Sequence, residues 1–256
     1  MPFKLAEHYT SACQRVRVVT EAWGERELFC ANCDSATLTR TPHNTRCVDL
    51  VCKRCEATFQ LKSGQGRLPR MIPDGAYSAM ISSIRENRAP NLLVLRYDLV
   101  SWRVNSLLLV PNFAFPESSI IQRKPLSAQA RRAGWTGCNI SLDRIPVDAR
   151  IPFIVDGVAR DRWDIRGDLK RLRPLTAISS RQRGWALEVL NCIRSRNFKS
   201  FTTRDVYACD EELQRLHPEN RHIRPKIRQQ LQVLRDTGFL RHTERGRWVV
   251  QDREAL

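Results

Sequence analysis

Two short cysteine motifs constrain the fold of this 256-residue chain more than any other feature. Cys30 and Cys33 form one CxxC pair, Cys52 and Cys55 form a second, and 18 residues separate the two pairs. Four thiolates at this spacing are typical of a tetrahedral zinc site. Such a site leaves no position open for water, so we expect a structural zinc ion that holds a hairpin too small to fold alone. A catalytic zinc site would more often include His or carboxylate ligands.

The charge of the chain indicates a polyanionic partner. It carries 43 Lys and Arg against 27 Asp and Glu, a formal net charge of +16, and its pI is about 10.1. We favour nucleic acid over a membrane surface because no basic helix shows a clean apolar face. No apolar run approaches the roughly 20 residues that span a bilayer, and the N-terminal residues lack the apolar core of a signal peptide.

The remaining five cysteines are scattered, and the total of nine is odd, so the usage suits a reducing cytosol better than a disulfide framework. We therefore expect a cytoplasmic protein in which these five are ordinary buried thiols. They are Cys13, Cys47, Cys138, Cys192 and Cys209.

Hydrophobic patterning predicts an α/β domain over residues 1–178, with a mixed sheet and flanking helices. One helix is expected over Tyr9–Glu27, and another is expected to begin at the N-cap Asp74 and to run through Ile84. Ser63–Gly66 is expected to interrupt the pattern, and a linker is expected around Pro174–Ser180. Strands are expected at Arg46–Val51, Ala57–Lys62, Leu92–Tyr97 and Ser106–Val110.

Residues 179–256 have the pattern of an α+β winged-helix domain. Trp185 and Leu190 lie on a first predicted helix, and Thr202 or Thr203 is placed to cap a second. The third predicted helix covers His222–Asp236, and two strands after Gly238 form the wing. The other faces of this third helix carry Arg and Gln, whose donors match guanine and adenine edges. A solvated charged face of a structural domain is the alternative explanation.

Three polar residues beside the second cysteine pair form a possible nuclease site. Asp49 precedes the pair, and Gln60 and Lys62 follow it on one face of a predicted strand, because strand side chains alternate. If the chain turns at the cysteines, Asp49 and Gln60 lie close together. An acid, a second oxygen ligand and a lysine form the PD-(D/E)xK arrangement, which holds Mg²⁺ against the scissile phosphate. A half-exposed strand without a function would show the same three residues.

Longer strings extend this interpretation over nearly the whole chain. Ile120–Leu126, Ala130–Asn139, Arg183–Trp185 and Lys226–Gln232, together with Asp49 and Gln60-Leu61-Lys62, resemble the DpnI family of methyl-directed restriction endonucleases. The resemblance implies a PD-(D/E)xK nuclease core with a four-cysteine zinc site, followed by a winged helix. It also implies a bacterial cytoplasmic monomer that cleaves double-stranded GATC sites bearing N6-methyladenine, with structural Zn²⁺ and catalytic Mg²⁺.

The same resemblance assigns roles to individual residues. Asp49, Gln60 and the backbone carbonyl of Leu61 would hold magnesium, and Lys62 would act on the attacking water. Trp135 would pack against the adenine methyl groups, where an indole offers apolar area, although a core tryptophan is the alternative. The other residues expected at DNA are basic or amide side chains, namely Arg123, Lys124, Arg131, Arg132, Arg221, Arg224, Lys226, Arg228, Gln229, Gln232 and Arg245.

The chain departs from the family pattern at Gln60, where the family has Glu. An amide oxygen can bind Mg²⁺ but contributes no negative charge, so we expect a working enzyme with a raised Mg²⁺ requirement. Glu56, expected on the same strand face, or Glu21 on the first helix could supply the missing charge.

Three hypotheses follow from these residues. The first is a methylation-dependent endonuclease. The second is a methyl-adenine reader or repressor that lost catalysis at Gln60. The third is a zinc ribbon with a winged helix that binds DNA without regard to methylation.

Overall fold

The computed structural model describes residues 1–42, 45 and 47–251. Its contacts divide the chain into two compact units, and each consists of several sequence segments. The first unit comprises residues 1–70, 88–112 and 150–170, and the second comprises residues 71–87, 113–149 and 171–256. The two units are described separately below.

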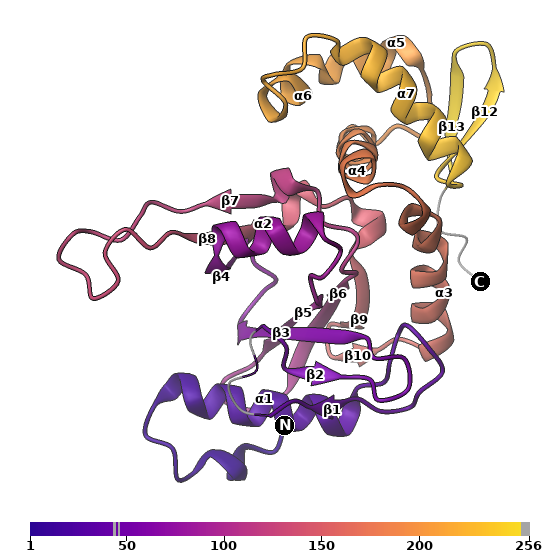
Figure 1. Cartoon of the computed structure of the whole chain (residues 1–256). Coiled ribbons are helices and arrows are strands. Elements are labelled where there is room, and N and C mark those ends of the chain that lie inside the picture. Colours follow the sequence, from indigo (N-terminus) through magenta and orange to yellow (C-terminus); the bar gives the residue numbers. More distant parts are fainter. Residues whose placement is uncertain (43–44, 46, 252–256) are drawn as a thin grey trace. The chain divides into compact units, whose positions relative to one another are not determined.

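A seven-stranded mixed sheet forms the core of the first unit (Figure 1), in the order β1-β2-β3-β5-β6-β9-β10. β3 and β5 are parallel, and every other neighbouring pair is antiparallel. The apolar runs predicted at β5 and β6 are buried at the centre, as expected for strands covered on both faces. The strands are β1 (Thr39–Arg40), β2 (Leu50–Val51), β3 (Thr58–Gln65), β5 (Asn91–Tyr97), β6 (Val104–Val110), β9 (Ile151–Val155) and β10 (Val158–Ala159).

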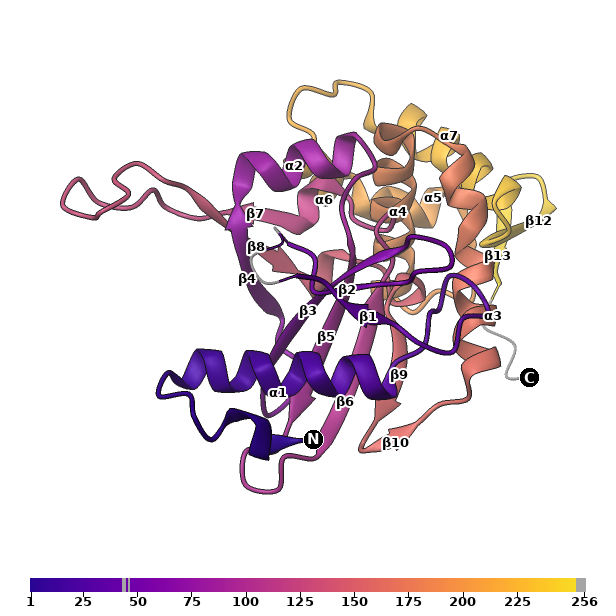
Figure 2. The same ribbon diagram turned by 60° about the horizontal axis from the view of Figure 1, so that its bottom comes forward.

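The helix α1 (Ala12–Glu27) packs on one face of this sheet (Figure 2), after a short 3₁₀ helix at Phe3–Ala6. Thr20 on α1 shares a hydrogen bond of 3.3 Å with Ser63 on β3. A Cβ added at Gly24 would lie 3.0 Å from Leu50 and 3.8 Å from Leu61, so glycine allows α1 to approach the sheet closely. Leu61 and Ser63 therefore face α1, and the alternating residues of β3 face the other way.

The helix α3 (Arg162–Leu172) was not predicted, because its sequence is rich in arginine. Ile165 and Leu169 are buried one helical turn apart and anchor it to the unit. Arg166 lies beside them and donates hydrogen bonds to the backbone carbonyls of Cys30 (3.1 Å) and Ser35 (3.0 Å). α3 thereby holds the first cysteine pair against the unit.

The second unit contains a three-stranded sheet of order β4-β8-β7, with α2 (Tyr77–Arg85) beside it (Figure 1). Two of its strands, β7 (Ile120–Gln122) and β8 (Gly137–Ser141), form a hairpin, and the connection between them extends away from the sheet. β4 (Met71–Ala76) pairs with β8. Short 3₁₀ helices lie at Glu117–Ser119, Leu142–Arg144 and Val147–Ala149.

The winged-helix pattern predicted for the C-terminal residues is confirmed. Thr202 caps the second helix, as one of the two predicted candidates, and forms a capping box with Asp205. Gly238 ends the third helix with φ +83°, a conformation that glycine adopts at little cost. A third strand, which was not predicted, joins the wing in the order β11-β13-β12. The elements are α4 (Ser180–Ser195), β11 (Ser200–Thr202), α5 (Thr203–Val206), a 3₁₀ helix (Tyr207–Cys209), α6 (Asp210–Leu216), α7 (Ile223–Asp236), β12 (Leu240–Glu244) and β13 (Arg247–Val250).

Several element boundaries differ from the predictions. Asp74 is not an N-cap, since it lies within β4 and the N-cap of α2 is Ala76. Ser63–Gly66 does not end the strand, because β3 continues to Gln65 in register with β5. The strand predicted over Arg46–Val51 is shortened to β2, and Arg46 itself lies outside the described residues. The expected linker contains a 3₁₀ helix, Arg173–Ala177, in which Leu175 is buried.

The expectation for the five scattered cysteines is largely wrong. Cys192 and Cys209 form a disulfide, and Cys13 and Cys47 are exposed. Cys138 is a buried free thiol, as predicted.

Candidate metal and DNA-binding sites

The four cysteines of the two CxxC pairs come together in the first unit. Their sulfur atoms all lie within 4.8 Å of one another, and Cys30–Cys55 and Cys33–Cys52 are each 3.6 Å apart. Tetrahedral zinc with Zn–S bonds of about 2.3 Å separates its sulfur ligands by about 3.8 Å. The cluster therefore fits a zinc ion, and its ligands within the described part of the chain are all thiols.

The two cysteine pairs adopt the same local backbone structure. The Cys30 N–H bonds the Ser35 carbonyl at 3.1 Å, and the Cys52 N–H bonds the Ala57 carbonyl at 2.9 Å. Burial raises the pKa of Cys30. Burial also acts to raise the pKa of Cys52, but backbone N–H groups and neighbouring thiols outweigh it and lower that pKa to about 6. Because the Cys52 N–H bonds the Ala57 carbonyl, the chain turns sharply at the second cysteine pair, from β2 into β3.

This turn brings Asp49 beside β3, as the sequence predicted. The backbone N–H of Asp49 bonds the Phe59 carbonyl at 2.9 Å, although Phe59 is already paired with Leu50 in the β2–β3 ladder. Its carboxylate Oδ2 then accepts a hydrogen bond of 2.7 Å from the backbone N–H of Leu61. The carboxylate thus takes the place of a backbone acceptor next to β3, at the residue just before β2 begins.

Gln60 and Lys62 lie on the same face of β3, opposite to α1, because Leu61 and Ser63 face α1. Gln60 is buried, with 8 % of its surface exposed, and Lys62 is half-buried. In a strand the N–H and C=O of one residue point to the same edge. The Leu61 carbonyl therefore points toward the edge that Asp49 occupies. Asp49, Gln60 and the Leu61 carbonyl supply oxygen donors of the kind that Mg²⁺ prefers.

The two carboxylates considered for the missing charge have different surroundings. Glu56 is not on the strand face: it is exposed, precedes β3, and has φ +60° in the turn after Cys55. Glu21 is buried on α1 and pairs with Arg17 at 2.5 Å. The Glu21 hydrogen bond and charge raise the pKa of Arg17, and the charge of Asp49 raises it further. Of the two carboxylates, Glu21 thus shares a cationic neighbour with Asp49.

Trp135 lies at the base of the long β7–β8 connection, in the second unit. Its ring is half-exposed, so it is not a core residue. The Arg132 guanidinium lies over the ring, 4.8 Å from its centroid. A Cβ added at Gly137 would lie only 2.9 Å from the indole, so glycine makes room for it. The remaining predicted residues of this segment, Arg123, Lys124 and Arg131, are exposed beside it.

The predicted DNA-binding residues of the winged helix fall into two groups. Arg228, Gln229 and Gln232 form an exposed stripe on α7, and Arg221 and Arg245 are exposed in the adjoining turns. Arg224, Lys226 and also Arg228 have partners on other elements, and Arg228 donates to the Tyr207 hydroxyl at 2.9 Å. Arg224 pairs with Asp210 at 2.6 Å. Lys226 is half-buried near the Trp185 ring, and burial, followed by the charge of Arg181, lowers its pKa.

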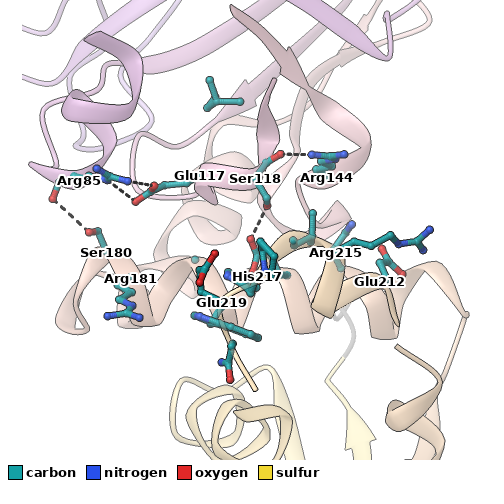
Figure 3. Close-up of a pocket in the computed structure, with 18 of the residues that line it drawn as sticks. Arg85, Glu117, Ser118, Arg144, Ser180, Arg181, Glu212, Arg215, His217 and Glu219 are labelled. Carbon is teal, nitrogen blue, oxygen red and sulfur yellow. Dashed lines mark hydrogen bonds and ion pairs between the residues drawn. The ribbon is translucent and has the colours of Figure 1, made fainter. Parts of the chain in front are cut away.

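Figure 3 shows a pocket of the second unit that was not predicted. Arg85 bonds Glu117 and Ser180 there, and Arg144 bonds the backbone of Ser118. The pocket contains a serine, a glutamate and a histidine, but the buried Glu188 lies between Ser118 and His217 and bonds both. A hydrolytic triad requires a hydrogen bond from serine to histidine, so this cluster is not a nucleophilic site.

The buried glutamate belongs to a polar stripe along α4. Five side chains of this helix bond to residues 85–148, at spacings that place them on one face. The pairs are Ser180 with Arg85, Arg183 with Asn87, Glu188 with Ser118, Asn191 with Asp143, and Arg194 with Asp148.

Comparison with protein families covers almost the whole chain. Residues 1–178 match the DpnI family model, described as the Dam-replacing family. Residues 181–249 match the DpnI_C model, described as the Dam-replacing HTH domain.

None of the helices in the described ranges is both long and apolar enough to cross a membrane.

Proposed function

The chain belongs to the DpnI family of methyl-directed restriction endonucleases, and from this premise we propose that it cleaves double-stranded DNA at GATC-like sites bearing N6-methyladenine. The observation that carries the proposal is the contact of the Asp49 carboxylate with the Leu61 backbone, beside Gln60 and Lys62. This contact places an acid beside the strand that carries an amide oxygen and an ammonium group on one face. A half-exposed strand without a function gives no reason for that grouping.

We assign the catalytic roles within residues 1–178. Asp49, Gln60 and the carbonyl of Leu61 would hold Mg²⁺, and the Lys62 ammonium would orient the attacking water and ease loss of its proton. Bound Mg²⁺ would polarise the phosphate and lower the pKa of the water. The zinc ion would hold the turn that places Asp49 next to β3, and it would take no part in the chemistry.

Recognition is assigned to two elements. Trp135 would contact the adenine methyl groups, and basic residues beside it would bind phosphates. The exposed stripe of α7 would read base edges within residues 179–256. We propose that the protein acts as a monomer in the bacterial cytoplasm.

A methyl-adenine reader without nuclease activity is the second candidate, and Gln60 is the observation that favours it. This residue is uncharged and buried where the family carries an acid, so the metal site has one negative charge fewer.

One experiment separates the candidates. Adenine-methylated and unmethylated plasmids are incubated with the protein, with and without Mg²⁺. Cleavage of the methylated plasmid alone supports the endonuclease. A methyl-dependent gel shift without cleavage under any divalent metal supports the reader, and binding that is indifferent to methylation contradicts both.

A further inference from the structure

Arg96 is a basic residue of the first unit that the sequence did not single out. It lies on β5 directly beside Gly64 of β3 in the parallel ladder. A Cβ added at Gly64 would lie 1.8 Å from Nη1 of Arg96, so the guanidinium occupies the space above this glycine. Gly64 is two residues beyond Lys62 and four beyond Gln60. Side chains alternate along a strand, so Arg96 lies on the same face of the sheet as both.

The guanidinium is half-buried without an acidic partner in the described part of the chain. Its Nε is buried there and has no hydrogen-bond acceptor. Burial lowers the pKa of Arg96, and the ionisable neighbour that acts against this shift is Tyr97 rather than a carboxylate. A desolvated cation with an unused donor is costly unless an anion binds to it. Among the residues that the structure describes, most ion-paired arginines have a carboxylate within 3.0 Å, so Arg96 differs from them.

We propose that Arg96 binds a DNA backbone phosphate next to the scissile one, which deepens the nuclease function proposed above and rests on it. Lys62 and Gly64 are two residues apart on β3, which is a distance of ~7 Å along the strand. Two neighbouring phosphates of a DNA strand are separated by a similar distance. The planar guanidinium donates two parallel hydrogen bonds to phosphate oxygens, a geometry that lysine cannot reproduce. Arg96 thereby positions the strand so that the neighbouring phosphate meets Asp49 and Lys62.

The test measures how salt weakens binding of the full chain to a short duplex with one methylated GATC site, without divalent metal. Each phosphate contact contributes about 0.9 to the slope of log K against log salt. Arg96→Gln should reduce the slope by about 0.9, so the affinity lost relative to wild type shrinks about eightfold for each tenfold rise in salt. The preference for methylated over unmethylated duplex should stay as in wild type, because Arg96 contacts no base.

Gly64→Ala provides a second route to the same result. The new methyl group pushes the guanidinium from its place without changing any charge, so the slope should also fall. Gly167→Ala is the matched control, because a Cβ there meets nothing within 4 Å, and it should retain the wild-type slope. Arg96→Lys should recover most of the slope but not the cleavage rate, since a point charge replaces the planar fork.

A wild-type slope in a folded Arg96→Gln variant would overturn the proposal. If this variant does not fold, Gly64→Ala and Arg96→Lys decide the question: a wild-type slope in Gly64→Ala together with a wild-type cleavage rate in Arg96→Lys overturns the proposal. The nuclease assay reports separately: a reduced slope in a protein that never cleaves DNA keeps the phosphate contact and removes the nuclease function.

Discussion

The carboxylate of Asp49 accepts a hydrogen bond of 2.7 Å from the backbone N–H of Leu61, the residue that separates Gln60 from Lys62. The acid and the strand that carries its two partners are therefore joined through the backbone rather than through side chains. Side-chain substitutions on β3 leave this link in place. A residue at position 49 that still accepts the hydrogen bond but is uncharged therefore tests the charge of Asp49 without moving the strand.

Asp49→Asn should abolish cleavage and leave DNA binding intact. The amide oxygen can still accept the Leu61 hydrogen bond, so the strand geometry is kept and only the charge is lost. A metal site contributes several kcal/mol to the transition state, so the rate should fall more than about a hundredfold. Single-turnover cleavage and gel shifts measure the two effects, and a variant that still cuts would show that another carboxylate holds the metal.

Gln60→Glu should lower the Mg²⁺ concentration needed for half-maximal cleavage. The substitution adds a second negative charge to the site without changing the length of the side chain. Magnesium titrations of wild type and variant, at constant ionic strength, make the comparison. Superimposable titrations would show that Gln60 does not limit metal binding.

Trp135→Ala should reduce the preference for methylated DNA more than it reduces affinity for unmethylated DNA. Burying one methyl group contributes about 0.8 kcal/mol, so the preference should fall about fourfold for each methyl group contacted. Trp163→Ala is the matched control, because that side chain is 68 % exposed on α3. Equal loss on both DNAs would assign Trp135 to general binding.

Removing zinc should abolish cleavage even when Mg²⁺ is in excess. The free energy of metal binding at a site of four cysteines is largely folding free energy, and the turn at Cys52–Cys55 positions Asp49. Metal analysis should find one zinc ion per chain, and only added zinc should restore activity. Cys13→Ser, which removes an exposed thiol outside the cluster, should keep both the zinc and the activity.

Acid should weaken the winged helix through Asp205. Hydrogen bonds from the backbone and then the side chain of Thr202 lower the pKa of Asp205. The contribution of this carboxylate is therefore present above its unfolded pKa of about 3.9 and is lost as pH falls through the folded value. Urea unfolding between pH 5 and pH 3 should show a smaller decline for Asp205→Asn and for Thr202→Ala than for wild type. Thr202→Ser, which keeps the hydroxyl, should decline as wild type does.

The parts of the site that are local in sequence could be predicted. The CxxC spacing indicates the metal cluster directly, and a turn at Cys52–Cys55 is enough to bring Asp49 opposite Gln60. The winged helix was predictable for the same reason, because its helices are periodic and its cap and wing residues lie within a few positions of one another.

The parts that depend on long-range pairing could not be predicted. The position of Arg96 above Gly64 follows from the parallel register of β3 and β5, which no local pattern specifies. Glu56 is an even number of residues from Gln60, so strand periodicity places both on one face. The turn at Cys52–Cys55 instead leaves Glu56 outside the strand. α3 was missed because few of its residues are apolar, and its anchor to the Cys30 backbone is an arginine.

The polar stripe of α4 has a consequence for how this protein can evolve. The first family match ends at residue 178 and the second begins at residue 181, and every bond of the stripe joins a residue beyond 178 to one before it. If relatives exchanged their C-terminal segments at this point, buried groups such as Glu188 would lose their partners. The two matched segments are thus expected to be inherited together. Changes at Glu188 or Arg194 should be accompanied by changes at Ser118 or Asp148.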